Sequence, residues 1–349
     1  MTARNASDGR RFSTLAQAVL GSRYATVVVA LVGLAVLSPI LAPGSLGQSA
    51  LLSMLPFAAI LAVVAAGQTM IIQQAGIDLS VPGAVSLSAM LMNTIAAGDD
   101  SRIAPAVLVA LAGTLLAGIV TGLAVSWFSV TPLVATLAVN GLLLGTVLAI
   151  SGGQSAMQSP KALTDLALGR TIGVPNLVIA AVVAIALVTF VTTKTVYGRR
   201  FVAVGVSPRA ARAAGIRTVG YTVSAFALAG LCYGLAGVML AAYSGAPSVF
   251  VGNSYLLPSI AAVVIGGTAL SGGKGSIAAT ALGALFLTQL DQVVSGLGGP
   301  NAVQDIVQGA VILFALTLHG LITFIRTRIR YRTTPDRPPV PDPVETATS

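Results

Sequence analysis

The polar side chains best suited to contact a solute lie in one stretch, Gly67–Gly83, between two apolar runs. The candidates for lining or gating a path for a polar solute are Gln68, Thr69, Gln73, Asp78 and Ser80. A carboxylate at the centre of a bilayer costs about 2.5–3.5 kcal/mol, so such side chains usually face protein or water. Pro82 predicts a break in the helix, which is tolerated only where the backbone is packed or lines a cavity. A polar interhelical loop capped by Asp78 is an equally weighted alternative.

A second concentration of functional groups is the basic loop Thr192–Arg217. Its middle predicts a short helix, because Ser207 suits the N-cap, Pro208 the first helical position and Gly215 the helix end. The residues that would contact a partner there are Ser207, Pro208, Arg209, Ala210, Ala211, Arg212 and Gly215. On composition alone, a loop whose positive charge only fixes topology is the favoured interpretation.

The Gly-rich stretch Ile265–Ser276 superficially resembles a phosphate-binding loop. That motif needs Gly at position 268 and Ser or Thr at position 275, whereas this chain has Thr268 and Gly275. We therefore expect a tight turn between two membrane helices here and no nucleotide site.

No catalytic or metal-binding constellation emerges from the remaining residues. Cys232 is the only cysteine and His319 the only histidine, so they cannot build a Cys/His metal cluster. No nucleophile motif and no paired carboxylates occur on one predicted helix, which argues against an enzyme. Asp291 and Asp305 flank an outer loop, where they either contact a soluble partner or are solvated helix ends.

Three glycine pairs have the spacing that lets membrane helices approach closely. These pairs are Gly118/Gly122, Gly141/Gly145 and Gly230/Gly234. We expect all three to serve packing inside one subunit.

The composition requires these residues to be positioned by membrane helices. Of the 349 residues, 55% are hydrophobic and only 8% are charged, against roughly 25% charged in soluble domains. This balance excludes an ordinary soluble enzyme, a disordered chain and a nucleic-acid binder, and it makes the lipid bilayer the main partner of the surface. The fold class predicted is an all-α, polytopic membrane helix bundle.

Ten runs are long and apolar enough for a bilayer core of about 30 Å, which needs about 20 residues. They are Tyr24–Leu41, Leu51–Ile72, Leu79–Ala97, Ile103–Phe128, Leu133–Ile150, Val174–Val191, Val219–Tyr243, Tyr255–Leu270, Ile277–Val294 and Val303–Ile325. An even number places both termini on one side. Sixteen of the 19 Lys and Arg then share that side, and only Arg102, Lys161 and Arg170 lie on the other, so both termini are expected in the cytoplasm.

This topology gives three parts: a cytoplasmic N-terminal segment 1–23, a transmembrane domain 24–325 with the cytoplasmic loop 192–217, and a basic, then Pro-rich, cytoplasmic tail 326–349. The first run has 18 apolar positions, which exceeds the 7–15 of a signal peptide, so we expect it to be retained as a span.

Four segments together resemble the permease subunits of ribose/monosaccharide-type ABC importers, in the branched-chain amino acid/ribose permease superfamily. In the order of that family they read GQTMIIQQAGIDLSVPGAVSLSAML (Gly67–Leu91), TPLVATLAVNGLLLGTVLAISGGQ (Thr131–Gln154), YGRRFVAVGVSPRAARAAGI (Tyr197–Ile216) and LLPSIAAVVIGGTALSGGKGS (Leu256–Ser276). The resemblance covers about Ala50 to Leu318, and its specificity comes from the four motifs in order.

The resemblance implies a type II-like importer membrane domain of about ten helices in the bacterial cytoplasmic membrane. It implies two ABC ATPase subunits that bind ATP and Mg, a second permease copy or paralogue, and an extracytoplasmic solute-binding protein. The helix Ser207–Gly215 would couple to the ATPase. The coupling motif often begins with Glu before two Ala, whereas Arg209 stands here, so the partner must accept a cation.

The function implied is import of a small polar solute by alternating access, with ribose or another monosaccharide expected and no cofactor in this chain. A permease for branched-chain amino acids or nucleosides is the first alternative. A stand-alone secondary transporter is the second, and it is disfavoured because the acidic residues lie near predicted helix ends.

Overall fold

The computed structural model describes residues 24–298 and, beyond them, residues 302, 303, 306, 307, 309, 310, 313 and 317. The segment 1–23, the tail 326–349, Asp305, His319 and most of the tenth run lie outside the described residues. The helices and the short hairpin follow this order: α2 (Ala25–Leu41), α3 (Gln48–Gln73), α4 (Val81–Ala96), η1 (Asp100–Arg102), α5 (Ile103–Trp127), α6 (Pro132–Ser151), α7 (Lys161–Leu168), β1 (Arg170–Thr171), β2 (Val174–Pro175), α8 (Asn176–Lys194), α9 (Val196–Val206), α10 (Pro208–Ala213), α11 (Thr218–Ser244), η2 (Val251–Tyr255), α12 (Leu256–Ile265) and α13 (Ile277–Gly296).

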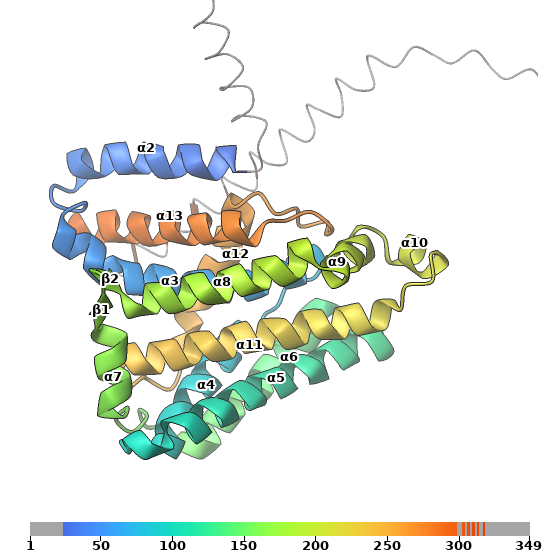
Figure 1. Cartoon of the computed structure of the whole chain (residues 1–349), viewed down its shortest axis with the longest axis horizontal. Coiled ribbons are helices and arrows are strands. Elements are labelled where there is room, and N and C mark those ends of the chain that lie inside the picture. The colour runs from blue at the N-terminus through green and yellow to red at the C-terminus, as the bar shows by residue number, and fades with distance from the viewer. Residues whose placement is uncertain are drawn as a thin grey trace, which may run out of the picture.

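The chain folds as a bundle whose long helices run roughly along one common direction (Figure 1). Within the described residues, six helices are long and apolar enough to cross a membrane: α3, α5 with η1, α6, α8, α11 and α13. Shorter apolar helices cover Val27–Leu41, Val81–Ala96 and Val251–Ile265. An all-α membrane bundle is therefore confirmed, apart from the two-stranded hairpin β1–β2.

The core of the bundle lies around α3 and α11. These helices bury 67% and 78% of their most apolar segments, whereas α5 and α8 each bury 17%. The outer helices expose large apolar side chains such as Leu116, Leu142 and Leu187. Lipid-facing surface needs this composition, because exposed polar groups have no partner in hydrocarbon.

Helices α5 and α11 pack with their backbones almost in contact. A Cβ added to Gly118 would lie 2.2 Å from the carbonyl oxygen of Phe226, and one on Gly230 would lie 2.3 Å from that of Thr114. Close packing inside the subunit is thus confirmed for two glycine pairs. The prediction was wrong for Gly141/Gly145, whose Cβ positions have no atom within 4 Å among the described residues.

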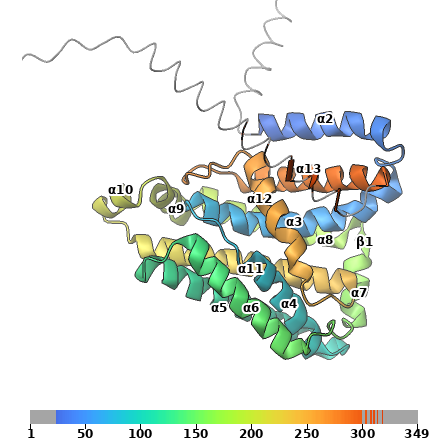
Figure 2. The ribbon, with the colours of Figure 1, turned by 180° about the vertical axis from the view of Figure 1, so that it is seen from behind.

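One predicted run is much shorter as a helix than expected. The run Tyr255–Leu270 is α-helical only over Leu256–Ile265, because glycine turns follow it, whereas the run Leu79–Ala97 is one continuous helix from Val81 to Ala96. Figure 2 shows α12 crossing in front of α3 instead of running along it. The run Val174–Val191 begins in β2, and its helix extends to Lys194.

Candidate functional site

The polar stretch after α3 forms a compact, buried turn. Asp78 has 2% of its side-chain surface exposed. One of its carboxylate oxygens, Oδ1, accepts hydrogen bonds from the Ser80 backbone N–H (2.8 Å) and the Ser80 hydroxyl (2.6 Å). This pattern closes an Asx turn just before α4 begins. Asp78 therefore closes the turn between the two helices, while the N-cap of α4 is Ser80, which makes no side-chain capping hydrogen bond.

The polar side chains of α3 join that helix to its neighbours. Gln68 Oε1 accepts a hydrogen bond from the Tyr233 hydroxyl of α11 at 3.0 Å. The hydroxyl of Thr69 lies 2.9 Å from that of Thr280 in α13. These contacts tie three membrane helices together at one level of the core.

All five candidate path residues are buried in the subunit. Gln68 and Thr69 are 0% exposed, and Gln73 is 4% exposed. Gln68 Nε2 and Gln73 Oε1 have no hydrogen-bond partner among the described residues. A buried polar atom without a partner is costly, so it marks a place where water or another conformation supplies the missing bond. A role in lining or gating the path stays a prediction.

Helix α10 is capped at both ends by the residues that predicted it. The Ser207 hydroxyl accepts the Ala210 N–H at 3.3 Å. Gly215 has a φ of +78°, its N–H bonds the Arg212 carbonyl at 2.9 Å, and the Ile216 N–H bonds the Ala211 carbonyl at 3.0 Å. These two bonds with a left-handed glycine make a Schellman cap.

The surface of α10 is open for contact. Every residue from Pro208 to Gly215 is exposed except Ala211, which anchors the helix with 4% exposure. Figure 1 shows α10 at the far tip of the bundle, beyond the ends of the long helices. A partner can therefore reach α10 without displacing any membrane helix.

Helix α9 links α10 to the core, and the sequence analysis missed it. The Gln74 side-chain amide donates to the Phe201 carbonyl at 2.9 Å. A Cβ on Gly205 would lie 2.0 Å from the Gln73 carbonyl oxygen. Two features of the sequence weakly indicate this helix. Thr195 is a suitable N-cap residue and does cap the helix, and the apolar residues Phe201 and Val204 have helical spacing and share one buried face.

The Gly-rich loop between α12 and α13 completes this junction. The Gly273 N–H donates to the same Gln73 carbonyl at 2.8 Å. Gly272 and Gly273 both have positive φ values, and a Cβ on Gly272 would lie 2.7 Å from the Gly205 carbonyl oxygen. These glycines are thus explained by close packing of the loop against α9 and the end of α3.

The two ends of the bundle differ in charge. We call the end that carries α9 and α10 the basic end. Of the ten Lys and Arg in 24–298, seven lie there: Lys194, Arg199, Arg200, Arg209, Arg212, Arg217 and Lys274. A cleft of about 500 Å³ beside α10 is lined by Arg200, Arg217 and Tyr221 among others. This surface suits an acidic group on a partner.

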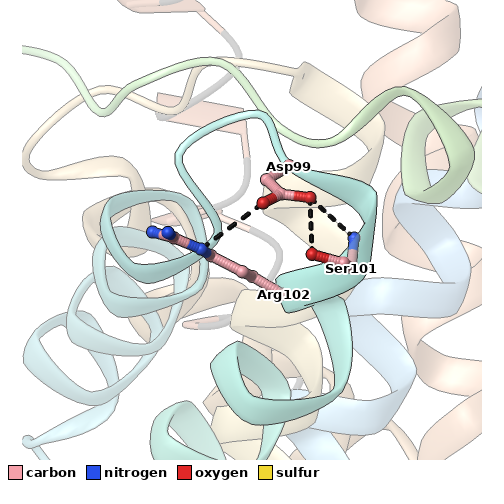
Figure 3. A network of polar contacts seen from close by, with 3 residues as sticks. All are labelled: Asp99, Ser101 and Arg102. Carbon is pink, nitrogen blue, oxygen red and sulfur yellow. Dashed lines mark hydrogen bonds and ion pairs between the residues drawn. The ribbon is translucent and has the colours of Figure 1, made fainter.

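The opposite end carries nearly balanced charges in short turns. Asp99 accepts hydrogen bonds from the Ser101 N–H (2.9 Å) and hydroxyl (2.7 Å), and it pairs with Arg102 at 3.4 Å (Figure 3). The bonds from Ser101, together with the nearby Arg102, lower the pKa of the Asp99 carboxyl. Asp100 caps α7 by accepting the Ala162 N–H at 2.9 Å.

A larger cleft, of about 1080 Å³, opens in the half of the bundle nearer that opposite end. Residues of α3, η2, α12 and α13 line it, with Tyr243 from the end of α11. Asp291, near the end of α13, lines this cleft. Among the described residues, no group of three or more His, Cys, Asp or Glu could hold a metal ion.

Comparisons with known proteins agree with this architecture. The model of the family described as "Branched-chain amino acid transport system / permease component" matches residues 50–316. The relatives include proteins named autoinducer 2 import system permease protein LsrC. The one from Escherichia coli (strain K12 / DH10B) is 33% identical over 86% of this chain and 88% of its own length. The one from Salmonella paratyphi B is 32% identical over 86% and 87%.

No solved structure gave a significant match. The family match spans more than half of the chain and covers the buried α3–α4 turn, the α9–α10 region and the Gly-rich loop. The chain therefore belongs to the branched-chain amino acid transport system permease family, and it is a multi-pass ABC transporter permease of the ribose/monosaccharide type in the bacterial plasma membrane.

Proposed function

We propose that this chain is the membrane-spanning subunit of an ATP-driven importer that moves a small polar solute, such as ribose or another monosaccharide, by alternating access. The observation that carries the proposal is the similarity to import permeases over 86% of the chain. Those relatives are named for autoinducer 2, which becomes a further candidate solute. The family description favours branched-chain amino acids as the competing solute class.

The proposed topology has ten spans with both termini in the cytoplasm. The nine apolar helices that begin within 24–298 supply nine of them, and the last run supplies the tenth. The basic end is then cytoplasmic, because positively charged loops favour that side. The opposite end, with the turns around Asp99 and Asp100, faces the solute-binding protein.

The proposed partners at the basic end are two ABC ATPase subunits, which bind the ATP and Mg. Helix α10 docks on the ATPase because it is exposed, capped at both ends and anchored by Ala211. Arg209 replaces the acidic residue that often begins this motif. The cleft of about 500 Å³ beside α10 is lined by Arg200 and Arg217, so the matching ATPase surface should be acidic.

A short series of contacts connects α10 to the membrane helices. It passes through α9 to the Gln73 carbonyl, where α3, α9 and the Gly-rich loop meet. From there, the α3–α4 turn with Asp78 leads to the polar contacts of Gln68. We propose that these residues change partners when the path opens, which gives the unpaired atoms Gln68 Nε2 and Gln73 Oε1 their hydrogen bonds.

The proposal is tested by weakening the α10 cap without removing any side-chain contact. Gly215→Ala places a Cβ in open space but at a left-handed φ, which costs about 1–2 kcal/mol. Gly220→Ala is the matched control, because its Cβ position is also open and its φ is not positive. We expect Gly215→Ala alone to reduce ATPase binding and ribose uptake. Equal ATPase binding and uptake in both variants would refute the coupling role of α10.

A further inference from the structure

The cleft of about 1080 Å³ has an unusual lining for a membrane protein. Six side chains of the Ser, Thr, Asn and Gln types line it: Ser53, Asn253, Ser254, Thr288, Gln292 and Ser295. Hydrocarbon offers such groups no partners, so a face that carries them must be covered by protein or by water.

The cleft reaches deep into the bundle because η2 dips back between the helices. The Gly252 N–H bonds the Ser86 hydroxyl at 2.9 Å, and a Cβ on Gly252 would lie 2.2 Å from the Pro82 carbonyl oxygen. Pro82 is near the start of α4, whose 16 residues span about 24 Å before the opposite end. Irregular backbone at this depth is tolerated when it is packed or lines a water-filled cavity.

Two residues of η2 are exposed in the cleft. Asn253 and Ser254 follow the packed Gly252, and both side chains are exposed within the cleft. On α3, the lining runs from Ser53 to Leu61, a depth of about 12 Å. Two turns beyond Leu61, along the same face of α3 toward the basic end, Gln68 is fully buried.

The chemistry of the lining selects against carboxylate-bearing solutes. Among the described residues that line the cleft, Asp291 is the one charged side chain, and none is Lys, Arg or His. A zwitterionic amino acid would therefore bring its carboxylate to a site without a cation, near a fixed negative charge. Neutral hydroxyl groups, in contrast, both donate to and accept from Ser, Thr, Asn and Gln.

Aromatic rings supply the apolar part of the site. Phe57 and Tyr243 stack edge to face with ring centroids 5.0 Å apart, and Phe57 remains 43% exposed. Tyr255 lines the cleft from η2. Small-molecule sites commonly combine such apolar walls with a few placed polar groups. A ring with hydroxyl groups at its edge and C–H groups on its faces fits both parts.

We propose that this cleft is the outward half of the solute path and that it selects neutral polyhydroxylated solutes over zwitterions. The inference rests on the proposed import function and adds its solute class and the residues that recognise it. Asn253 and Ser254 are the residues assigned to solute contact, and the broken η2–α12 element holds them at that depth.

Accessibility tests the first half of the inference in the full chain in membranes. Cys232 is the only cysteine and is buried, so the wild type provides a low background. We expect Ser254→Cys to react with a membrane-impermeant thiol reagent at least about tenfold faster than Leu142→Cys, since thiolates form in water and not in lipid. Leu142 is the control because it lies 68% exposed on the apolar face of α6. Equal, slow labelling of both variants would overturn the proposed water-filled cleft.

Protection tests the second half, with D-ribose and L-leucine as probes. Millimolar D-ribose should slow labelling of Ser254→Cys, and L-leucine should not. Asn253→Leu should lower ribose uptake by roughly three- to tenfold through a higher KM, because it removes one hydrogen-bonding group. Leu257→Val, which keeps the cleft wall apolar, is the control for this variant.

The outcomes separate this inference from the importer proposal. Protection by L-leucine, protection by neither probe, or unchanged uptake in Asn253→Leu would overturn the selection of neutral solutes. If the wild type imports ribose in an ATPase-dependent way while Ser254→Cys stays unlabelled, only the cleft assignment fails. If no ATPase-dependent uptake exists in the wild type, the proposed function itself fails.

Discussion

Adding one methyl group at Gly205 should uncouple α9 from the membrane core. The new Cβ would lie 2.0 Å from the Gln73 carbonyl oxygen and 3.1 Å from the Gly273 nitrogen, whereas ordinary contacts begin at 3.4 Å. All of these atoms belong to the backbone, so the side chain cannot escape by rotation. Either α9 or the end of α3 must move by more than 1 Å.

The expected cost follows from overpacking. Extra atoms forced into a packed site typically cost about 1–3 kcal/mol. The shift would also stretch the 2.9 Å hydrogen bond from the Gln74 amide to the Phe201 carbonyl and the 2.8 Å bond from the Gly273 N–H to the Gln73 carbonyl. We expect Gly205→Ala to unfold at a temperature a few degrees lower and to lose most ATP-driven uptake, because the route from α10 to α3 is broken.

The assay compares thermal unfolding in detergent and ribose uptake in proteoliposomes for Gly205→Ala and Gly220→Ala. The control places its methyl group in open space on a helix, where alanine gains about 0.5–1 kcal/mol over glycine. Identical unfolding temperatures and uptake rates in the two variants would refute the transmission route through the Gln73 carbonyl.

Three further predictions concern packing, a buried hydrogen-bond node and charge. Gly118→Ala should lower the unfolding temperature, since its Cβ would meet the Phe226 carbonyl at 2.2 Å, whereas Gly141→Ala should not lower it. Asn93→Leu should also lower the unfolding temperature: it removes the hydrogen bonds from the Asn93 amide to the carbonyls of Met157 (2.8 Å) and Gly245 (3.0 Å), and each such bond contributes about 0.5–1.5 kcal/mol. Unfolding equal to that of the wild type would contradict the role of this node. The double change Arg200→Glu with Arg217→Glu should weaken ATPase binding most at low salt, which a binding titration at two ionic strengths would detect.

The sequence predicted the long helices well because their apolar runs end at strong turn signals. The predicted run Leu133–Ile150 corresponds to Pro132–Ser151 in α6, and Ile277–Val294 corresponds to Ile277–Gly296 in α13. Helix α10 was predictable for the same local reason, since Ser207 and Gly215 act through their own backbones and nearest neighbours.

The cleft and the α9 junction could not be predicted because distant segments create them. The residues of η2 give no sign that Gly252 contacts Ser86, since that hydrogen bond joins residues far apart in the chain. Gly205 reads as an ordinary loop glycine until the Gln73 carbonyl is placed against it. Asp291 was expected to flank an outer loop, and its place in the cleft depends on how α13 packs beside α3 and α12.

The most direct test of the account is ATP-driven transport by the reconstituted complex. Proteoliposomes would hold this chain with its ATPase, receive the solute-binding protein outside and contain ATP and Mg inside. The account predicts that radiolabelled solute accumulates only with hydrolysable ATP, and that an uncoupler leaves the rate unchanged. Uptake that persists without ATP or the ATPase and collapses with the uncoupler would contradict the account and indicate a secondary transporter.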